Sequence, residues 1–178
     1  MSTAPSDHRE PPHDDDLLAR TFAEQRAPLT RYAARLLGDP DRARDVVQDT
    51  FVKLMAQPPG AVNGHTVEWL YTVCRHASLD VLRKESRVRH FADGQMERVS
   101  AADPRPGRAL ERDETHAALL RLIERLPPNQ QEVVRLKFQN EFSYKEISRI
   151  TALSVTNVGF LLHTAVARLR AEFAAQPR

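Results

Sequence analysis

The sequence predicts an all-α protein in which a flexible linker joins two small helical domains, the C-terminal one a helix-turn-helix domain. Apolar residues recur at helical spacing over most of the 178 residues. Hydrophobic residues make up 41% of the chain but aromatic residues only 6%, which favours helical bundles over sheets. A stretch rich in Asp, Pro and Gly separates the two helical blocks, as a linker would.

The N-terminal part of the chain is expected to be a tail followed by a helix. Residues 1–16 are rich in Pro, Asp and Ser, a composition typical of disorder. The first helical domain is expected over residues 17–90. Its first segment contains Pro28, which should kink or divide the helix, and Gly38 should end it.

The second predicted helix begins at Asp39 and Pro40, because aspartate caps free amides and proline fits the first helical position. Its apolar residues recur at helical spacing and are expected to face the core: Ala43, Val47, Phe51 and Leu54. Acidic residues recur every four positions on its outer face, together with one valine: Asp41, Asp45, Asp49 and Val52.

A turn-rich loop over residues 57–65 precedes a long helix, predicted from a capping Thr66 to about Ser86. The residues expected to face the core are Leu70, Val73, Ala77 and Val81. Flanking this stripe, one side mixes an aromatic ring with charged groups: Trp69, His76, Asp80, Arg83 and Arg87. Such a side suits unpaired bases, which stack on rings, beside phosphates, which attract arginine. The alternative for Trp69 is a partly buried core ring.

Residues 91–113 contain turn-forming and Pro-rich sequences and are predicted to form the linker, and the second domain is expected over residues 114–175. Within it, Ser143 and Glu146 predict a capping box, and Ser154 can cap the next helix. The buried stripe expected in this last helix is Val158, Leu162, Ala165, Val166 and Leu169. Two helices joined by this turn predict a helix-turn-helix, whose second helix enters the DNA major groove. A plain three-helix bundle is the alternative.

Charge and composition exclude several functional classes. A net charge of +2 with local basic patches suits a polyanionic partner. The single cysteine, Cys74, suits a reducing cytosol, and no apolar run approaches the ~20 residues of a membrane span. A cytoplasmic protein without membrane association is therefore expected. Because the sequence contains no phosphate loop, nucleophile motif or metal-ligand spacing, no catalytic residue, cofactor or metal is predicted.

Three segments resemble the two-domain sigma factors of the extracytoplasmic-function (ECF) group, the small specificity subunits of bacterial RNA polymerase. Residues 38–51 resemble the family's polymerase-binding helix, residues 68–84 its promoter-melting helix, and residues 126–170 its C-terminal DNA-reading domain. The resemblance covers about residues 17–173. It implies a transcription initiation factor that binds core polymerase, reads the −10 promoter element with its first domain (sigma region 2), and reads the −35 element with its second (sigma region 4).

The resemblance implies three candidate surfaces. The core polymerase surface would consist of Asp41, Arg42, Asp45, Gln48, Asp49 and Val52. The −10 surface, with a loop pocket for a base flipped out of the duplex, would consist of Asn63, His65, Trp69, His76, Arg83, Lys84 and Arg87. The −35 surface would consist of Lys145, Arg149, Ser154, Thr156, Asn157 and Phe160. Asparagine can read adenine there, and threonine or phenylalanine can contact a thymine methyl.

The sequence departs from the family pattern at three places. Arg42 and Arg44 stand where acids are usual, His76 stands where asparagine is common, and residues 155–162 of the reading helix have no charge. Either Arg44 folds away and the other acids suffice, or the unmodified chain binds polymerase poorly. In the second case, phosphorylation of Thr50, expected between core and outer face, would supply about −1.5 to −2 charges. One branch of the family is activated in this way; otherwise Thr50 is an ordinary surface threonine.

The predicted partners are core RNA polymerase and promoter DNA, with a Ser/Thr protein kinase or an anti-sigma factor as regulator. Two other functional classes compete. A repressor or activator that never joins polymerase would need only the second domain, which leaves the first domain unexplained. An adaptor that scaffolds protein partners would have no affinity for DNA.

Overall fold

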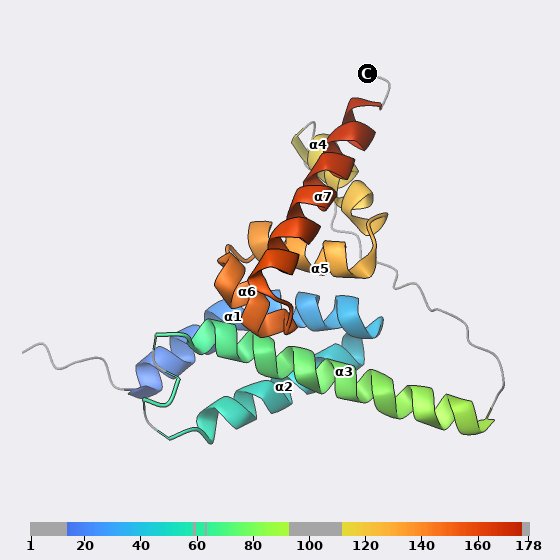
Figure 1. Cartoon of the computed structure of the whole chain (residues 1–178). Helices are drawn as coiled ribbons and strands as arrows, with labels where there is room; N and C mark the ends of the chain where they lie inside the picture. Colours follow the sequence, from blue (N-terminus) through green and yellow to red (C-terminus); the bar gives the residue numbers. More distant parts are fainter. Residues whose placement is uncertain (1–13, 59, 63, 93–111, 176–178) are drawn as a thin grey trace, which may run out of the picture. The chain divides into compact units, whose positions relative to one another are not determined.

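The structure, a computed structural model, describes residues 14–58, 60–62, 64–92 and 112–175 (Figure 1). Every described regular element is an α-helix, and the chain divides into two compact units, Met1–Gln95 and Met96–Arg178. The predicted all-α, two-domain fold class is therefore confirmed. The predictions for the tail and for the linker fall mostly outside the described residues. Residues 14–16 are an exception, since they belong to the first helix and not to a disordered tail. The ends of the predicted linker are another exception, because one helix continues to Ala92 and the next begins at Arg112.

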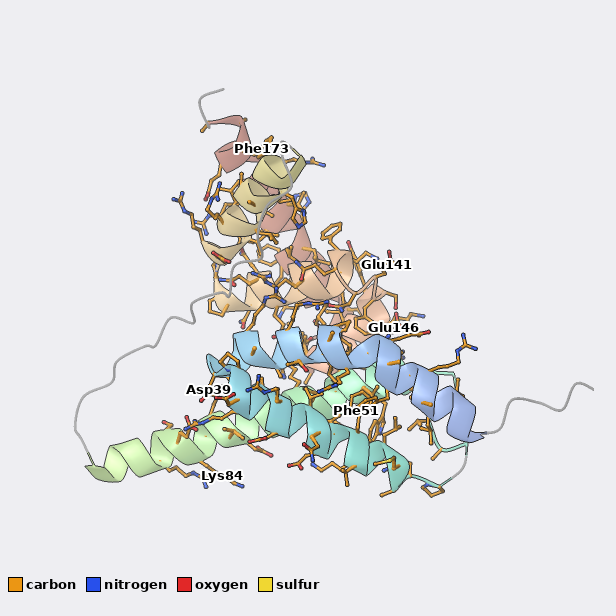
Figure 2. All side chains as sticks on the ribbon, turned by 180° about the vertical axis from the view of Figure 1, so that it is seen from behind. Asp39, Phe51, Lys84, Glu141, Glu146 and Phe173 are labelled. Carbon is orange, nitrogen blue, oxygen red and sulfur yellow. The ribbon has the colours of Figure 1, made fainter. Side chains whose placement is uncertain are left out.

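The first unit is a bundle of α1 (Asp14–Leu37), α2 (Pro40–Met55) and α3 (Thr66–Ala92), in which each helix contacts the other two. Its buried apolar residues come from all three helices: Leu29, Tyr32, Ala33, Ala43, Val46, Val47, Phe51, Leu54, Leu70, Tyr71 and Cys74. Figure 2 shows Phe51 between α2 and α1, where its ring meets that of Phe22 at 4.8 Å between centroids. This core fixes which side of α2 and of α3 remains exposed.

One predicted helix boundary in this unit needs correction, and one prediction is narrowed. The helix α1 continues through Pro28, which excludes division, one of the two predicted effects of the proline; the core contacts of Leu29, Tyr32 and Ala33 hold the turn that follows it. Thr66 does not cap α3, since its hydroxyl donates to the carbonyl of Val62 at 2.9 Å. The residue before the helix is His65, whose carbonyl accepts the N–H of Trp69 at 2.9 Å.

The buried stripe of α3 also differs from the prediction. Leu70 is buried as expected, but Val73, Ala77 and Val81 are only half-buried. Tyr71, Cys74 and Ser78 take their place in the core, with the Ser78 hydroxyl donating to the carbonyl of Cys74 at 2.8 Å. Because the buried stripe lies at different positions around α3 than predicted, the predicted nucleic-acid side of α3 is directly opposite the core. The sequence had placed that side only next to the buried stripe.

The second unit contains α4 (Arg112–Glu124), α5 (Pro128–Phe138), α6 (Tyr144–Thr151) and α7 (Val155–Ala174), and α7 contacts each of the other three. Its buried apolar residues are Leu122, Ile123, Leu126, Val133, Val134, Leu136, Phe142, Ile147, Ile150, Val158, Leu162, Ala165 and Leu169. Val166, predicted to belong to the buried stripe of α7, is half-buried. The long helix α7 therefore packs against all three other helices of this unit, and its side opposite the buried stripe is exposed.

The helices α6 and α7 have the geometry of a helix-turn-helix. They are bent by 105° at the turn between them, within the range of about 90–120° for this motif. Ala152 makes the turn with a left-handed φ of 59°, and the Ser148 hydroxyl donates to the carbonyl of Leu153 at 2.5 Å. These contacts fix the angle at which α7 leaves the turn.

Both predicted caps in this motif are confirmed. The Ser143 hydroxyl accepts the N–H of Glu146 at 3.3 Å, and the Glu146 carboxylate accepts the N–H of Ser143 at 2.7 Å. Hydrogen bonds from the side chain and backbone of Ser143 lower the pKa of Glu146. The Ser154 hydroxyl accepts the N–H of Asn157 at 3.2 Å. Both helices of the motif thus begin where the capping residues predicted.

Among the described helices, none alone is long and apolar enough to cross a membrane. The helices α6 and α7 reach that length and composition only when taken together, across their 105° bend.

Candidate functional site

One side of α2 presents an exposed stripe of acidic, amide and apolar side chains. The six predicted residues of the core polymerase surface are all exposed: Asp41, Arg42, Asp45, Gln48, Asp49 and Val52. Met55, 65% exposed, continues the stripe one turn beyond Val52, which is 52% exposed. Met55 was not among the predicted residues, although its i+3 spacing from Val52 was a usable signal. An acidic face with an apolar end suits a basic protein partner.

The two unexpected arginines of α2 are paired with acids of the same unit. Arg44 contacts the carboxylate of Asp41, three residues earlier on the same helix. Arg42 contacts Asp39 at 3.3 Å and also Glu85 of α3. Arg44 therefore does not fold away toward the core, since 63% of its side chain is exposed. Both positive charges are offset locally, while no ion pair of Asp45 or Asp49 occurs among the described residues.

Thr50 lies in the core, contrary to its predicted place between core and outer face. Only 1% of it is exposed, and its hydroxyl donates to the carbonyl of Val46 at 2.7 Å. The Cys74 thiol lies among the hydroxyls of Ser78 and Thr50, and burial raises its pKa to about 12. The side chain of Thr50 points inward because α3 packs over this side of α2. A kinase therefore cannot reach the hydroxyl while α2 and α3 are packed.

The exposed side of α3 brings together most of the predicted −10 residues. His76, Arg83, Lys84 and Arg87 are exposed, Trp69 is half-buried, and His65 is exposed just before the helix. Figure 2 shows the labelled Lys84 projecting outward from α3. The half-burial of Trp69 is compatible with both predicted alternatives, a ring that stacks on bases and a partly buried core ring. Asn63, the remaining predicted residue, lies outside the described residues.

The charges on this side of α3 are mostly positive. Arg83 donates to Asp80 at 3.0 Å in an exposed pair, which holds the guanidinium beside the helix. Four cations or potential cations occur within three turns, namely His76, Arg83, Lys84 and Arg87, against Asp80 and the paired Glu85. A ring at one end and cations along the helix can stack on a base and neutralise the phosphates beside it.

The exposed side of the helix-turn-helix carries all six predicted −35 residues. Lys145 and Arg149 lie on α6, Ser154 caps α7, and Thr156, Asn157 and Phe160 lie in its first two turns; all are exposed. The stripe that points directly away from the core is Thr156, Phe160, His163 and Ala167. Hydrogen-bonding and apolar groups therefore occupy the side of α7 that a DNA groove would meet.

The ring of Tyr144, at the start of α6, lies beside Gly159 of α7. A Cβ built at this glycine would lie 3.6 Å from Cε2 of Tyr144, which is ordinary van der Waals contact. The Lys137 ammonium lies 5.8 Å from the centroid of the same ring. The half-exposed ring of Tyr144 therefore lies between the second turn of α7 and the ammonium of Lys137, which also donates to the carbonyl of Phe142 at 3.2 Å.

No group of three or more His, Cys, Asp or Glu side chains within the described ranges is arranged to hold a metal ion. The chemistry that these surfaces offer is hydrogen bonding, stacking and charge.

Comparison with known proteins finds matches over both units. The family Sigma-70 region 2 matches residues 22–88, and the family Sigma-70, region 4 matches residues 116–169. The ECF RNA polymerase sigma factor EcfG of Rhodopseudomonas palustris is 30% identical over 158 residues, covering 88% of this chain and 82% of that protein. The ECF RNA polymerase sigma factor SigL of Mycobacterium tuberculosis is 30% identical over 163 residues, covering 86% and 87%.

A solved structure shares the fold. The sigma factor RpoE of Bartonella quintana, crystallised in complex with the anti-sigma factor NepR, superposes with a TM-score of 0.66 at 22% identity. The match covers 89% of this chain and 98% of that one.

Proposed function

Because this chain belongs to the ECF RNA polymerase sigma factors, we propose that each of its three exposed surfaces contacts a different partner during transcription initiation. The outer side of α2 binds core RNA polymerase, the exposed side of α3 engages the −10 element, and the helix-turn-helix engages the −35 element. The observation that carries the proposal is the presence of both sigma regions in one chain, each with most of its predicted contact residues exposed. A repressor would need only the second region.

Polymerase binding is assigned to Asp45, Gln48, Asp49, Val52 and Met55, which line one exposed stripe of α2. Because Arg42 and Arg44 are already paired with acids of their own unit, we expect the unmodified chain to bind core polymerase. A titration of purified core enzyme with unphosphorylated chain, its mass verified, tests this. Saturable binding is expected; no binding by the folded chain would contradict the proposed function.

Replacing Trp69 or His76 with alanine should reduce open-complex formation more than closed-complex binding, since both side chains would act on unpaired bases. Permanganate footprinting of the bubble, compared with a DNA-binding assay, separates the two steps. His116→Ala, an exposed histidine of α4, is the matched control and should leave both steps unchanged. Normal opening by both variants would place the melting surface elsewhere.

Asn157→Ala should relax base preference at one position of the −35 element by ~1–3 kcal/mol, because an asparagine side chain can bond both edge atoms of adenine. Lys145→Ala should instead weaken binding to all sequences. The slope of log affinity against log salt concentration should become smaller by about one, as loss of a phosphate contact does. Binding to a panel of promoter variants at two salt concentrations measures both effects. Asn129 is exposed at the start of α5, so Asn129→Ala is the control for loss of an amide side chain. If Asn157→Ala and Lys145→Ala lose the same affinity for every promoter variant, the assignment of Asn157 to a base is refuted.

Regulation is proposed at two levels. The fold neighbour was crystallised with an anti-sigma factor, and we propose that a protein of this class regulates the present chain in the cytoplasm. Phosphorylation of Thr50 by a Ser/Thr kinase stays a prediction, and its burial imposes a condition on it. The kinase would have to act while α2 is separated from α3, so the phosphate would change the packing of the first unit as well as its charge.

A further inference from the structure

The outward side of α7 has an unusual composition for a helix that enters a DNA groove. Phe160 lies at its centre and is 65% exposed, with Thr156 one turn before it and His163 one turn after. From Val155 to Ala167 the helix contains no Lys, Arg, Asp or Glu. The exposed groups available to base edges in its first two turns are therefore a phenyl ring, the Val155 side chain at the start of the helix, hydroxyls and one amide.

This set of groups restricts the bases that the helix can read. Guanine is recognised most often by bidentate Arg or Lys contacts to its O6 and N7 atoms, and no such side chain is present there. Asn157 supplies the amide that matches adenine. The one apolar group that the major groove displays is the C5-methyl of thymine, so an exposed phenyl ring has only this group to bury against.

We propose that Phe160 reads a thymine methyl in the upstream promoter element, which makes this element rich in A·T pairs at the positions facing α7. The inference rests on the proposed function, since it assigns the base class recognised by the same helix-turn-helix. Lys145 and Arg149 on α6 supply the charge for the phosphates on either side. Specificity and electrostatic affinity thus come from different helices of the motif.

The test uses holoenzyme reconstituted from the full chain and core RNA polymerase. Duplexes randomised over the upstream element are selected for binding, and thymine should be enriched at one or more positions on one strand. The selected duplex is then made with deoxyuridine in place of each enriched thymine, which removes only the methyl group. The affinity should fall roughly fourfold when the thymine that faces Phe160 is replaced, equivalent to ~0.8 kcal/mol for one buried methyl.

Substitutions of Phe160 test whether its ring causes the preference for thymine over deoxyuridine. Phe160→Ala should bind the thymine and deoxyuridine duplexes equally, and Phe160→Leu, which stays apolar, should retain part of the preference. Phe138→Ala removes a phenyl ring of nearly equal exposure, 63%, from α5 and should keep the full preference. Because Phe160 is exposed, its substitution should change thermal stability little, which circular dichroism checks.

Each of the following results would overturn the inference: no enrichment of thymine, equal binding of both duplexes by the unaltered chain, or a thymine preference that survives in Phe160→Ala. Loss of core polymerase binding by Phe160→Ala with an unchanged base preference would also overturn it, because the ring would then contact protein. Holoenzyme that binds no duplex at all would contradict the proposed function itself, which separates the two failures.

Discussion

Replacing Asp45 and Asp49 with lysine should abolish binding to core RNA polymerase while leaving the first unit folded. Both carboxylates are exposed on the outer stripe of α2, and their reversal changes the charge of that stripe by about four units. Like charges placed across an interface cost several kcal/mol, enough to remove measurable association. Titration of core enzyme with each purified variant measures the loss.

The fold should tolerate this double change. In the double variant the repulsive Asp41–Asp45 pair becomes attractive, the pair at positions 45 and 49 stays repulsive, and the attractive Asp49–Lys53 pair becomes repulsive. Such pairs contribute only about 0.2–0.5 kcal/mol each and nearly cancel here. Glu24→Lys, an exposed acid on α1 outside the stripe, is the matched control and should bind normally. Undiminished binding by the double variant, with an intact melting curve, would refute the assignment of α2.

Thr50→Glu should strongly destabilise the first unit. The site is 1% exposed, and the polar groups that contact the Thr50 hydroxyl are the carbonyl of Val46, which accepts it, and the Cys74 thiol. An uncompensated buried charge costs roughly 3–5 kcal/mol, a large share of the stability of a small domain. Urea unfolding followed by circular dichroism should show the loss.

Thr50→Val serves as the isosteric control for this experiment. It removes the hydroxyl and keeps the volume, so the cost should be about 1 kcal/mol, the typical net value of one hydrogen bond. It should therefore fold and still bind core polymerase. If Thr50→Glu unfolds at the same urea concentration as the unaltered chain, the threonine is not buried in solution. If Thr50→Val is folded but inactive, a modification of the hydroxyl is required.

Local signals in the sequence were sufficient to predict the helix-turn-helix. The capping box of Ser143 and Glu146 and the cap at Ser154 depend on residues at most three positions apart, so the sequence shows them directly. The exposed acids of α2 were likewise predictable from a four-residue period. The sites within these surfaces remain predictions, to be tested by the variants above.

Contacts between helices were less predictable. The Arg42–Glu85 pair joins residues on α2 and α3, and no periodicity relates them. The buried stripe of α3 was misplaced because Val73, Ala77 and Val81 fit helical spacing as well as Cys74 and Ser78 do, and hydrophobicity favoured the former. The same packing decides whether Thr50 faces α3 or solvent, which the pattern of α2 alone leaves undetermined.

The central claim, that the chain is a specificity subunit for initiation, is tested most directly by run-off transcription. Core RNA polymerase and the full chain are combined on a template that carries the duplex selected by their holoenzyme. A discrete transcript is expected only when both proteins are present, and Asp45→Lys with Asp49→Lys should abolish it. Folded chain that leaves core polymerase unable to start at any selected sequence would contradict the account.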